Sequence, residues 1–342
     1  MSKPQRILLI EQYGIGDGVL STPAIAGVRK AHPDAHITSL AAAGVAELRH
    51  PCPLVDRVAE ISPGPMPDIA RFDMIVDLTG KLSTARLARR LRAPVRVGCP
   101  WWTGRLFVGL FYTRRVAARR GIHVVEHKCD IAVAAGASGC PVRPEIWLTE
   151  QDHEAAKSWL HAAGIDADDC VVAVNPGARS RGRAWRVDRY AAVCDALRQS
   201  EGCAAIVVGG PEDVVAARNI AALCSSKPAV AAGMLTVRQT AALLSRCAAL
   251  VTGDTGPMHI AAAVGTRVIA LFGRSDPWWS GPLGEGHVIV TAGLACSPCR
   301  GMPHLRHRIC LTRYACMDRI TPERVIGALH QVLDHRRKAV RS

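Results

Sequence analysis

The stretch that decides the fold is residues 250–277, LVTGDTGPMHIAAAVGTRVIALFGRSDP. Apolar runs at 249–251 and 268–272 predict two strands that bracket a helix beginning near Pro257. Proline is tolerated in a first helical turn, because its missing N–H would have no partner there. A helix that starts at the carboxyl end of a strand presents free backbone N–H groups, which suit an anion such as a nucleotide diphosphate. An ordinary capped strand–helix–strand unit explains the same residues without a ligand.

The bulk composition predicts a globular protein with room for two domains. The chain has 342 residues, of which 49% are hydrophobic and 21% are charged. Its net charge of +14 favours an anionic partner such as a nucleic acid, an acidic lipid or a phosphorylated glycan. No apolar run is long enough to span a bilayer, and the first residues, MSKPQRILLIEQYG, lack a signal-peptide cleavage pattern. We therefore expect a cytoplasmic protein.

Apolar runs alternate with helical patterns along the chain, which predicts an α/β fold with parallel sheets. The clearest runs are 6–10, 35–40, 72–78, 170–174 and 204–208. The strand pattern pauses between Pro141 and Asp169, and a fresh sheet begins after that pause. We therefore expect a first domain over 1–165 and a second over 166–342.

A glycine-rich loop with one carboxylate follows the first predicted strand. Gly14, Gly16 and Gly18 let the backbone approach a ligand closely, and a helix is expected over 19–31. The same glycine spacing occurs in dinucleotide-binding loops, but the acidic ribose partner that those loops need is not evident downstream. Taken alone, Asp17 is explained as a helix cap.

The interval 78–125 contains no acidic residue. Its basic residues are Lys81, Arg86, Arg89, Arg90, Arg92, Arg96, Arg105, Arg114, Arg115, Arg119 and Arg120. Bulky apolar residues are interleaved with them, namely Trp101, Trp102, Phe107, Phe111 and Tyr112. Such a mixture suits a membrane interface or a phosphate-bearing acceptor, and a solvated basic face is the plain alternative. Nucleic acid is not expected, because no helix-turn-helix, zinc-finger or RNA-recognition motif accompanies the charge.

Three loops that follow predicted strands in the second domain carry polar groups suited to a nucleotide. The turn after 170–174 can contact phosphate, the acids after 204–208 are placed for ribose hydroxyls, and the helix start after 249–251 adds a histidine donor. The segment 232–234 is expected to line the base, although Met234 fits the core equally well. The expected donor-binding residues are Asn175, Gly177, Ala178, Arg179, Glu212, Asp213, Met234, Asp254, Thr255, Gly256 and His259.

The thirteen cysteines fall into two groups. Most are single and scattered through apolar segments, which suits a reducing compartment where cysteine acts as a small hydrophobe. Examples are Cys170, Cys194, Cys203, Cys224 and Cys247. Four others form a C-x2-C-x10-C-x5-C pattern, which fits either a tetrahedral zinc or iron ion or four reduced or buried thiols. These four are Cys296, Cys299, Cys310 and Cys316.

Several of these motifs together resemble glycosyltransferase family nine, the lipopolysaccharide heptosyltransferases. The string D-T-G-P-M-H-I-A-A-A-V-G-T followed by V-I-A-L-F-G-R-S-D-P is similar to the nucleotide-sugar signature of that family. The segment HVVEH at 123–127 and the pattern C-x-P-C followed by C-M resemble further family segments. The family motif G-x-G-D-x-x-L-x-T-P is represented by Gly16, Asp17, Leu20, Thr22 and Pro23.

One loop departs from the family pattern. Arg183 stands where the family usually has the lysine of Lys-x-Trp-Pro, and Arg186 replaces the proline. Arginine keeps the positive charge that a leaving diphosphate requires, but its forked geometry differs from that of an ammonium group. Because Arg179 and Arg181 lie in the same loop, the assignment among these arginines is open.

The resemblance implies GT-B architecture, in which two Rossmann-like domains face each other across a cleft. It also implies metal-independent transfer of a sugar, with inversion, to a lipopolysaccharide core or related glycan. The first choice of donor is ADP-heptose, which would supply heptose. Asp17 would be the general base, and Arg183 with the helix start at 254–256 would stabilise the leaving diphosphate. No cofactor is required for catalysis, and a structural zinc or iron ion is one of the two interpretations of the four cysteines. The expected acceptor-binding residues are Gly16, Arg89, Arg90 and Arg92.

Other functions fit parts of the same sequence. A nucleotide-sugar epimerase of the same architecture would need no macromolecular acceptor, and a protein O-heptosyltransferase would use a different one. A basic nucleic-acid-binding module that senses a nucleotide is the non-enzymatic alternative. The basic interval leads us to expect association with an anionic membrane surface, at the inner face of the inner membrane.

Overall fold

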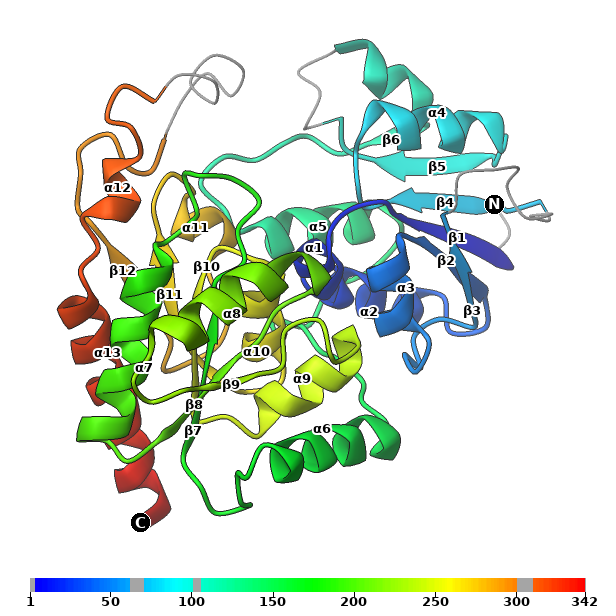
Figure 1. Cartoon of the computed structure of the whole chain (residues 1–342). Coiled ribbons are helices and arrows are strands. Elements are labelled where there is room, and N and C mark those ends of the chain that lie inside the picture. Colours follow the sequence, from blue (N-terminus) through cyan, green and yellow to red (C-terminus); the bar gives the residue numbers. More distant parts are fainter. Residues whose placement is uncertain (1–3, 62–70, 101–105, 300–309, 342) are drawn as a thin grey trace. The chain divides into compact units, whose positions relative to one another are not determined.

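The chain folds as two α/β units, Met1–Trp147 and Leu148–Ser342, each with a parallel sheet of its own (Figure 1). The computed structural model of the protein describes residues 4–61, 71–100, 106–299 and 310–341. The division precedes helix α6 (Glu150–Ala162), whereas the predicted boundary at residue 165 follows it. Because α6 packs against α9 (Val237–Ser245), it belongs with the second unit, and the strand pattern does not reveal that contact.

The sheet of the first unit has the strand order β3-β2-β1-β4-β5-β6, and every pair of neighbours is parallel. The strands are β1 (Arg6–Glu11), β2 (His36–Ala41), β3 (Arg57–Glu60), β4 (Met74–Asp77), β5 (Val95–Gly98) and β6 (Arg114–Arg115). The helices are α1 (Ile15–Val19), α2 (Thr22–Ala31), α3 (Ala43–Arg49), α4 (Leu82–Arg90), η2 (Leu106–Phe111) and α5 (Val124–Ala134). After β1 the chain first builds the sheet on one side and then on the other, so the direction of winding reverses beside β1.

The central strand β1 shows why its apolar run is continuous. Ile7 and Leu9 pack with residues of α2 and α5 on one face of the sheet. Leu8 and Ile10 pack with residues of α4 on the other face. A parallel strand covered by helices on both faces requires apolar side chains at successive positions, so this run predicted a buried strand correctly.

The second unit repeats this topology with the strand order β12-β11-β10-β7-β8-β9, again all parallel. The strands are β7 (Val171–Asn175), β8 (Ala204–Val207), β9 (Ala229–Val230), β10 (Ala249–Gly253), β11 (Arg267–Phe272) and β12 (Val288–Thr291). The helices after α6 are α7 (Val187–Ser200), η3 (Pro211–Asp213), α8 (Val214–Leu223), α9, α10 (Gly256–Ala263), α11 (Pro277–Ser280), α12 (Ala315–Asp318) and α13 (Pro322–Arg341). Here the winding reverses beside β7.

One expectation about the cysteines is corrected by this sheet. Cys170 and Cys203 form a disulfide, with 4.6 Å between their Cα atoms. They immediately precede Val171 and Ala204, which are paired in the register of β7 and β8, so the sheet brings the two cysteines together. Two cysteines that look scattered in sequence are therefore neighbours in space, and they are not independent reduced thiols.

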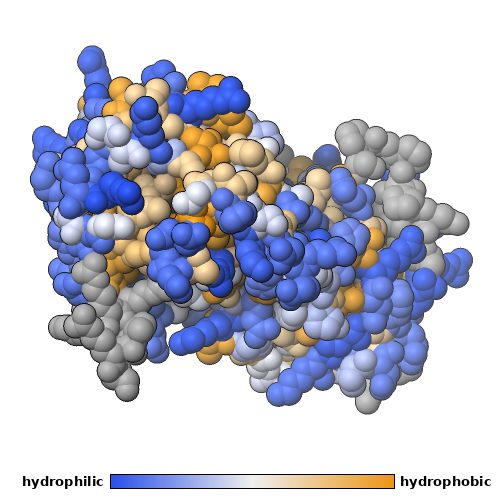
Figure 2. Space-filling model, turned by 60° about the horizontal axis from the view of Figure 1, so that its bottom comes forward, coloured by the Kyte–Doolittle hydropathy of each residue, from blue (hydrophilic) through white to orange (hydrophobic). Residues whose placement is uncertain are grey.

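The surface gives no sign of a bilayer span. None of the helices in the described part of the chain has the length and apolar character that crossing a membrane requires. Hydrophilic side chains cover much of the face in Figure 2, with smaller apolar areas between them.

Candidate functional site

Each sheet has one topological switch point, at which successive strands leave in opposite directions. It lies between β1 and β4 in the first unit and between β7 and β10 in the second. Loops at the carboxyl ends of the strands diverge there, and α/β proteins bind ligands in the resulting crevice. Asp17 follows β1, Asn175 ends β7 and Asp254 follows β10, so three of the predicted site residues lie at these two points.

Asn175 ties three strands together at the switch point of the second unit. Its buried side chain donates from Nδ2 to the carbonyl oxygen of Val208, at 3.0 Å. Its Oδ1 accepts from the hydroxyl groups of Thr252, at 3.1 Å, and Thr255, at 3.2 Å. The side chain that was predicted to bind the donor is thus engaged within the protein, where it holds the loops after β7, β8 and β10 in register.

The helix start predicted near Pro257 opens at the same edge. Thr255 is the N-cap residue of α10, but its hydroxyl group is bonded to Thr252 and Asn175 and makes no capping hydrogen bond to the first turn. Pro257 lies in that first turn, as expected. The backbone N–H groups and the helix dipole at Gly256 therefore remain suited to an anion.

Arg183 is held beside this helix start. Its Nη2 lies 3.1 Å from Asp254 Oδ2, and its Nη1 donates to the carbonyl oxygen of Asp254 at 3.4 Å. The carboxylate is 6% exposed and the arginine side chain 36% exposed, so the guanidinium group is both anchored and reachable. Arg186 instead pairs with the first turn of α7, and Arg179 and Arg181 are exposed. Among the four arginines of this loop, Arg183 is the one that the geometry brings to the start of α10.

The loops after β7 and β8 meet at Asp213. A Cβ atom at Gly177 or Gly209 would come within 2.7 Å of Asp213 Oδ2, so the carboxylate packs directly against both glycines. The same oxygen accepts from the backbone N–H of Gly210 at 3.1 Å. Burial raises the pKa of Asp213, and the neighbouring charge of Glu212 raises it further. The predicted phosphate-side and ribose-side loops are therefore side by side.

The remaining predicted donor-binding residues divide between surface and interior. Ala178 and Glu212 are exposed, and His259 is buried on α10 with 6% exposure. Met234 is 66% exposed, which excludes its interpretation as a core residue. Gly233, with φ of +73°, turns the chain immediately before it.

In the first unit, Asp17 lies in the first turn of α1 at the carboxyl edge of β1, directly after Gly16. Gly14 is the N-cap residue of this helix, so Asp17 does not act as the cap. Its side chain is 45% exposed, and its Oδ1 lies 4.0 Å from Nζ of Lys128 on α5. A half-exposed carboxylate at a switch point has the access that a general base requires.

Behind Asp17 lies a buried ion pair that sequence reasoning missed. Glu11 and Arg49, whose side chains are 0% and 1% exposed, are joined at 2.7 Å. Glu11 also accepts from the hydroxyl groups of Ser21 and Ser39, each at 2.7 Å. Arg49 Nη2 donates to the carbonyl oxygen of Gly18 at 2.6 Å, which fixes the end of α1. An acid that closes an otherwise apolar strand was the available signal, since a buried charge needs a partner.

The loop after β4 completes this edge. Asp77 accepts from the hydroxyl group of Tyr112 at 2.7 Å and from the backbone N–H of Thr79 at 2.8 Å. Burial raises the pKa of Asp77, against the lowering effect of these hydrogen bonds. Lys81 Nζ donates to the carbonyl oxygen of Gln12 at 2.7 Å, which joins the loop to the glycine-rich segment. The edge around Asp17 is thus rigidly supported.

The predicted acceptor arginines lie elsewhere. α4 begins after the carboxyl end of β4 and returns to the amino end of β5, so its last turn lies at the opposite edge of the sheet from Asp17. Arg89, Arg90 and Arg92 occupy that turn and its exit, and all three are exposed. The guanidinium carbon of Arg89 lies 5.5 Å from the centre of the Phe111 ring. Some members of the acid-free interval 78–125 lie outside the described residues, namely Trp101, Trp102, Arg105 and the side chain of Phe107.

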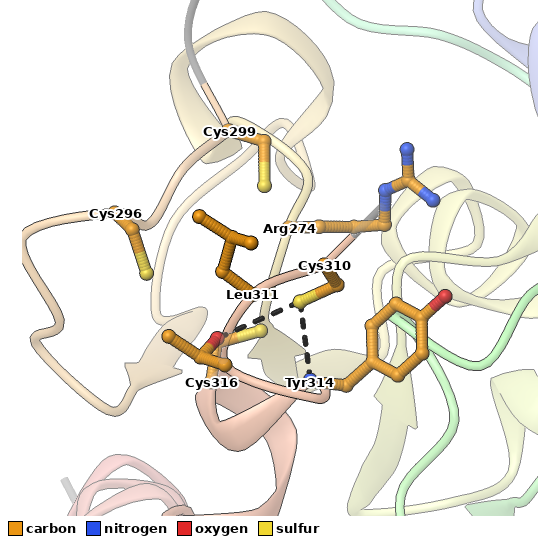
Figure 3. A pocket seen from close by; sticks show the side chains of 8 residues that line it. Arg274, Cys296, Cys299, Cys310, Leu311, Tyr314 and Cys316 are labelled. Carbon is orange, nitrogen blue, oxygen red and sulfur yellow. Dashed lines mark hydrogen bonds between the residues drawn. The ribbon is translucent and has the colours of Figure 1, made fainter. Parts of the chain in front are cut away.

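The four cysteines of the C-x2-C-x10-C-x5-C pattern line one cavity of about 220 Å³ (Figure 3). Their other neighbours there are Arg274, Leu311, Thr312 and Tyr314. Cys310 Sγ lies 3.5 Å from the hydroxyl group of Thr312, and this hydrogen bond is the main cause that lowers the thiol pKa. Among the described residues, no three His, Cys, Asp or Glu side chains are arranged to hold a metal ion. The zinc or iron ion therefore stays a prediction.

Comparisons with known proteins were made against this geometry. A family model described as glycosyltransferase family 9 (heptosyltransferase) matches residues 69–309. The chain is 26% identical over 296 residues to lipopolysaccharide heptosyltransferase 3 of Escherichia coli, which covers 81% of this chain and 85% of that protein.

Two solved structures resemble the whole chain. The glycosyltransferase family 9 structure from Veillonella parvula has a TM-score of 0.81 at 22% identity, covering 96% of this chain and 97% of that one. The E. coli ADP-heptose lipopolysaccharide heptosyltransferase II structure has a TM-score of 0.77 at 21% identity, covering 97% and 99%. The predicted GT-B fold class is confirmed by these likenesses.

Proposed function

Since the chain belongs to glycosyltransferase family 9, the heptosyltransferase family, we propose that it transfers heptose from ADP-heptose to a lipopolysaccharide core acceptor with inversion. The observation that supports this most is the switch point of the second unit. There the uncapped start of α10 and the anchored guanidinium group of Arg183 come together, and both favour a diphosphate. The related proteins named above, heptosyltransferase 3 and ADP-heptose heptosyltransferase II, supply the sugar and the acceptor class.

The transfer proceeds as a single displacement. The acceptor hydroxyl oxygen bonds to the anomeric carbon as the bond from that carbon to the diphosphate breaks. Asp17 takes the hydroxyl proton as general base, and ADP leaves with the bonding electrons. Arg183 and the N–H groups at the start of α10 stabilise the negative charge that grows on the diphosphate. Asp213 packs against Gly177 in the loop after β7 and is proposed to bind the ribose hydroxyls.

The acceptor side is assigned to the first unit, which carries Asp17 and Gly16. Arg89, Arg90 and Arg92 lie too far along α4 to share a small ligand with Asp17, so we assign them to distant anionic groups of a large glycolipid or to membrane headgroups. Leu110, which is 61% exposed on the neighbouring η2, adds an apolar contact of the kind found at membrane interfaces. We therefore propose a cytoplasmic location with peripheral binding to the inner face of the inner membrane.

The deciding experiment incubates the purified protein with ADP-heptose, with and without a heptose-deficient lipopolysaccharide acceptor. Acceptor-dependent release of ADP and a mass increase of one heptose on the glycolipid support the proposal. Isomerisation of the sugar nucleotide without acceptor would identify an epimerase, and heptose on added protein would identify a protein O-heptosyltransferase. Nucleotide binding without turnover, together with retention on nucleic acid, would identify the non-enzymatic module.

We propose that the four-cysteine cavity binds a zinc or iron ion with a structural role, separate from the sugar transfer. Four thiols line one cavity, and thiolates suit zinc and iron, although the described side chains are not arranged around an ion. No step of the transfer uses these thiols. Elemental analysis of protein purified without added metal should find one ion per chain. Substoichiometric zinc and iron together with four titratable thiols in this segment would contradict the metal.

A further inference from the structure

A buried lysine faces the proposed base. Lys128 is 4% exposed, although it lies on α5 only two residues from the surface residue Glu126. Its Nζ is 4.0 Å from Asp17 Oδ1, 3.9 Å from the centre of the Tyr13 ring and 3.5 Å from the carbonyl oxygen of Leu78. A carboxylate, a ring face and a carbonyl oxygen are three groups that attract a cation, and here they converge on one ammonium group.

Burying the charged group of Lys128 costs free energy. Desolvation lowers the pKa of Lys128, and the negative charge of Asp17 is the largest influence that opposes it. Lysine is almost never buried without a partner, and a methionine would fill the same volume without desolvating a charge. Packing alone therefore does not explain a lysine at position 128.

The other carboxylates near Lys128 are already engaged. Glu11 is paired with Arg49 and two serine hydroxyl groups, and Asp77 accepts from Tyr112 and from backbone N–H groups. The charged or titratable groups that act on Lys128 are Asp17 on α1, Tyr13 before it, Glu11 on β1, Arg49 on α3, Asp77 on β4 and His127 on its own helix. Of the carboxylates in this set, Asp17 is the half-exposed one and thus the one that a substrate can reach.

We propose that Lys128 is a positioning residue that holds Asp17 with one oxygen turned inward, so that its second oxygen is free for the acceptor hydroxyl. This inference rests on the proposed role of Asp17 as general base. The ammonium group attracts the nearer carboxylate oxygen at 4.0 Å and so restricts the rotation of the side chain. The Tyr13 ring and the Leu78 carbonyl hold the ammonium group without competing for the second carboxylate oxygen.

The test compares K128M with K30M, which removes an exposed lysine of α2 in the same unit. In K128M, kcat should fall about 10- to 100-fold, because the base loses the contact that orients it, while the donor KM should stay unchanged. A merely structural role of Lys128 would change the donor KM or the Tm as well. Tm should stay equal or rise, because a buried charge is replaced by an apolar side chain. K30M should match the parent in all three.

A double variant separates this inference from the proposed function. If Lys128 acts through Asp17, K128M should lower kcat in the parent but have no further effect in D17N. An active D17N would remove Asp17 as the base and with it the proposed mechanism. An inactive D17N combined with a K128M that keeps its kcat would overturn the Lys128 inference alone. A fall in the Tm of K128M together with a raised donor KM would also overturn it, because a structural role would change both.

Discussion

The two switch points have the same topology but different chemistry. In the first unit the edge is built from charges: Glu11 with Arg49, and Asp17 with Lys128. In the second unit the buried centre is neutral, with the amide of Asn175 bonded to the hydroxyl groups of Thr252 and Thr255. One charged pair, Arg183 with Asp254, lies outside that neutral centre. Identical strand orders therefore do not dictate the same kind of site.

This difference agrees with the two tasks of a transferase. A base must be accessible and correctly oriented, and the charged groups around Asp17 hold its surroundings in place. A diphosphate site must offer donors and positive charge, and buried carboxylates without a cation beside them would repel the ligand. The neutral network orders the loops of the second unit without adding negative charge where the diphosphate is proposed to bind.

The largest expected effect separates the two tasks. D17N should lower kcat by about 10²–10⁴-fold, the usual weight of a general base, while ADP affinity stays unchanged. R183M should lower kcat by about 10²–10³-fold and also weaken ADP binding, because the guanidinium group contacts the diphosphate in both states. Steady-state kinetics and calorimetric titration with ADP measure these quantities.

Arg181, exposed in the same loop, provides the matched control. R181M should keep both kcat and ADP affinity within a few-fold of the parent. If R181M or R179M reproduces the R183M phenotype, the assignment of the leaving-group cation to Arg183 is wrong. If D17N weakens ADP binding as much as R183M does, the division of tasks between the two units fails.

The next effect concerns stability. R49M leaves Glu11 buried without its cation, and breaking one partner of a buried ion pair costs about 3–5 kcal/mol. Chemical denaturation should show this loss in the free energy of unfolding of the first unit. The double variant E11Q/R49M should recover part of it, because the uncompensated charge is gone. Equal losses in the single and double variants would show that packing, not charge, is responsible.

The same pair predicts a pH dependence. Burial raises the pKa of Glu11, but the charge and hydrogen bonds of Arg49 lower it by more than burial raises it. The pKa therefore lies below its ordinary value of 4.5. A lowered carboxyl pKa contributes stability above the ordinary value that is lost as the pH falls through the folded-state value. The stability difference between the parent and E11Q should therefore be full at neutral pH and shrink below about pH 4.5. A difference that grows on acidification would contradict this sign.

The sequence predicted the repeated part of the molecule well. Buried parallel strands are continuous apolar runs, so β1, β7 and β11 could be read directly, and Pro257 marked the start of α10. The helix expected over 19–31 is α2, which begins only at Thr22, and the separate short helix α1 precedes it. Family motifs pointed to Asp17 and Arg183, which the structure places at the switch points.

The partners of these residues could not be predicted, because they come from distant elements. Arg49 is at the end of a helix, where a basic residue usually is solvated and interacts with the helix dipole. Lys128 follows a histidine on a helix of mixed character, and only the packing of α5 shows that it is buried. Arg89, Arg90 and Arg92 were grouped with the acceptor by charge alone, and charge does not tell which edge of a sheet a helix end reaches.

A smaller effect tests the neutral network of the second unit. T252V removes one of the two hydroxyl groups that donate to Asn175, while Thr255 continues to donate. The loss should be about 1 kcal/mol in the free energy of unfolding, the usual net value of a hydrogen bond, and well below that of R49M. N175A breaks the links to all three loops and should cost more, and should weaken ADP binding as well. A T252V loss as large as that of R49M would remove the contrast between the charged and the neutral edge.

The smallest effect concerns the exposed arginines at the far edge of the first unit. Arg89, Arg90 and Arg92 each contribute about 0–1 kcal/mol in water, so only their joint action is measurable. The triple variant R89E/R90E/R92E should raise the acceptor KM several-fold and weaken binding to anionic vesicles, with kcat at saturating acceptor and ADP affinity unchanged. Raising the salt concentration from about 0.05 to about 0.5 M shortens the Debye length severalfold and should reproduce the loss in the parent but not in the triple variant.

Because these arginines lie away from Asp17, a synthetic acceptor short enough to reach only the Asp17 edge should show neither effect. If the full acceptor behaves in the same way as the short one, the basic stretch is a solvated face and takes no part in recognition.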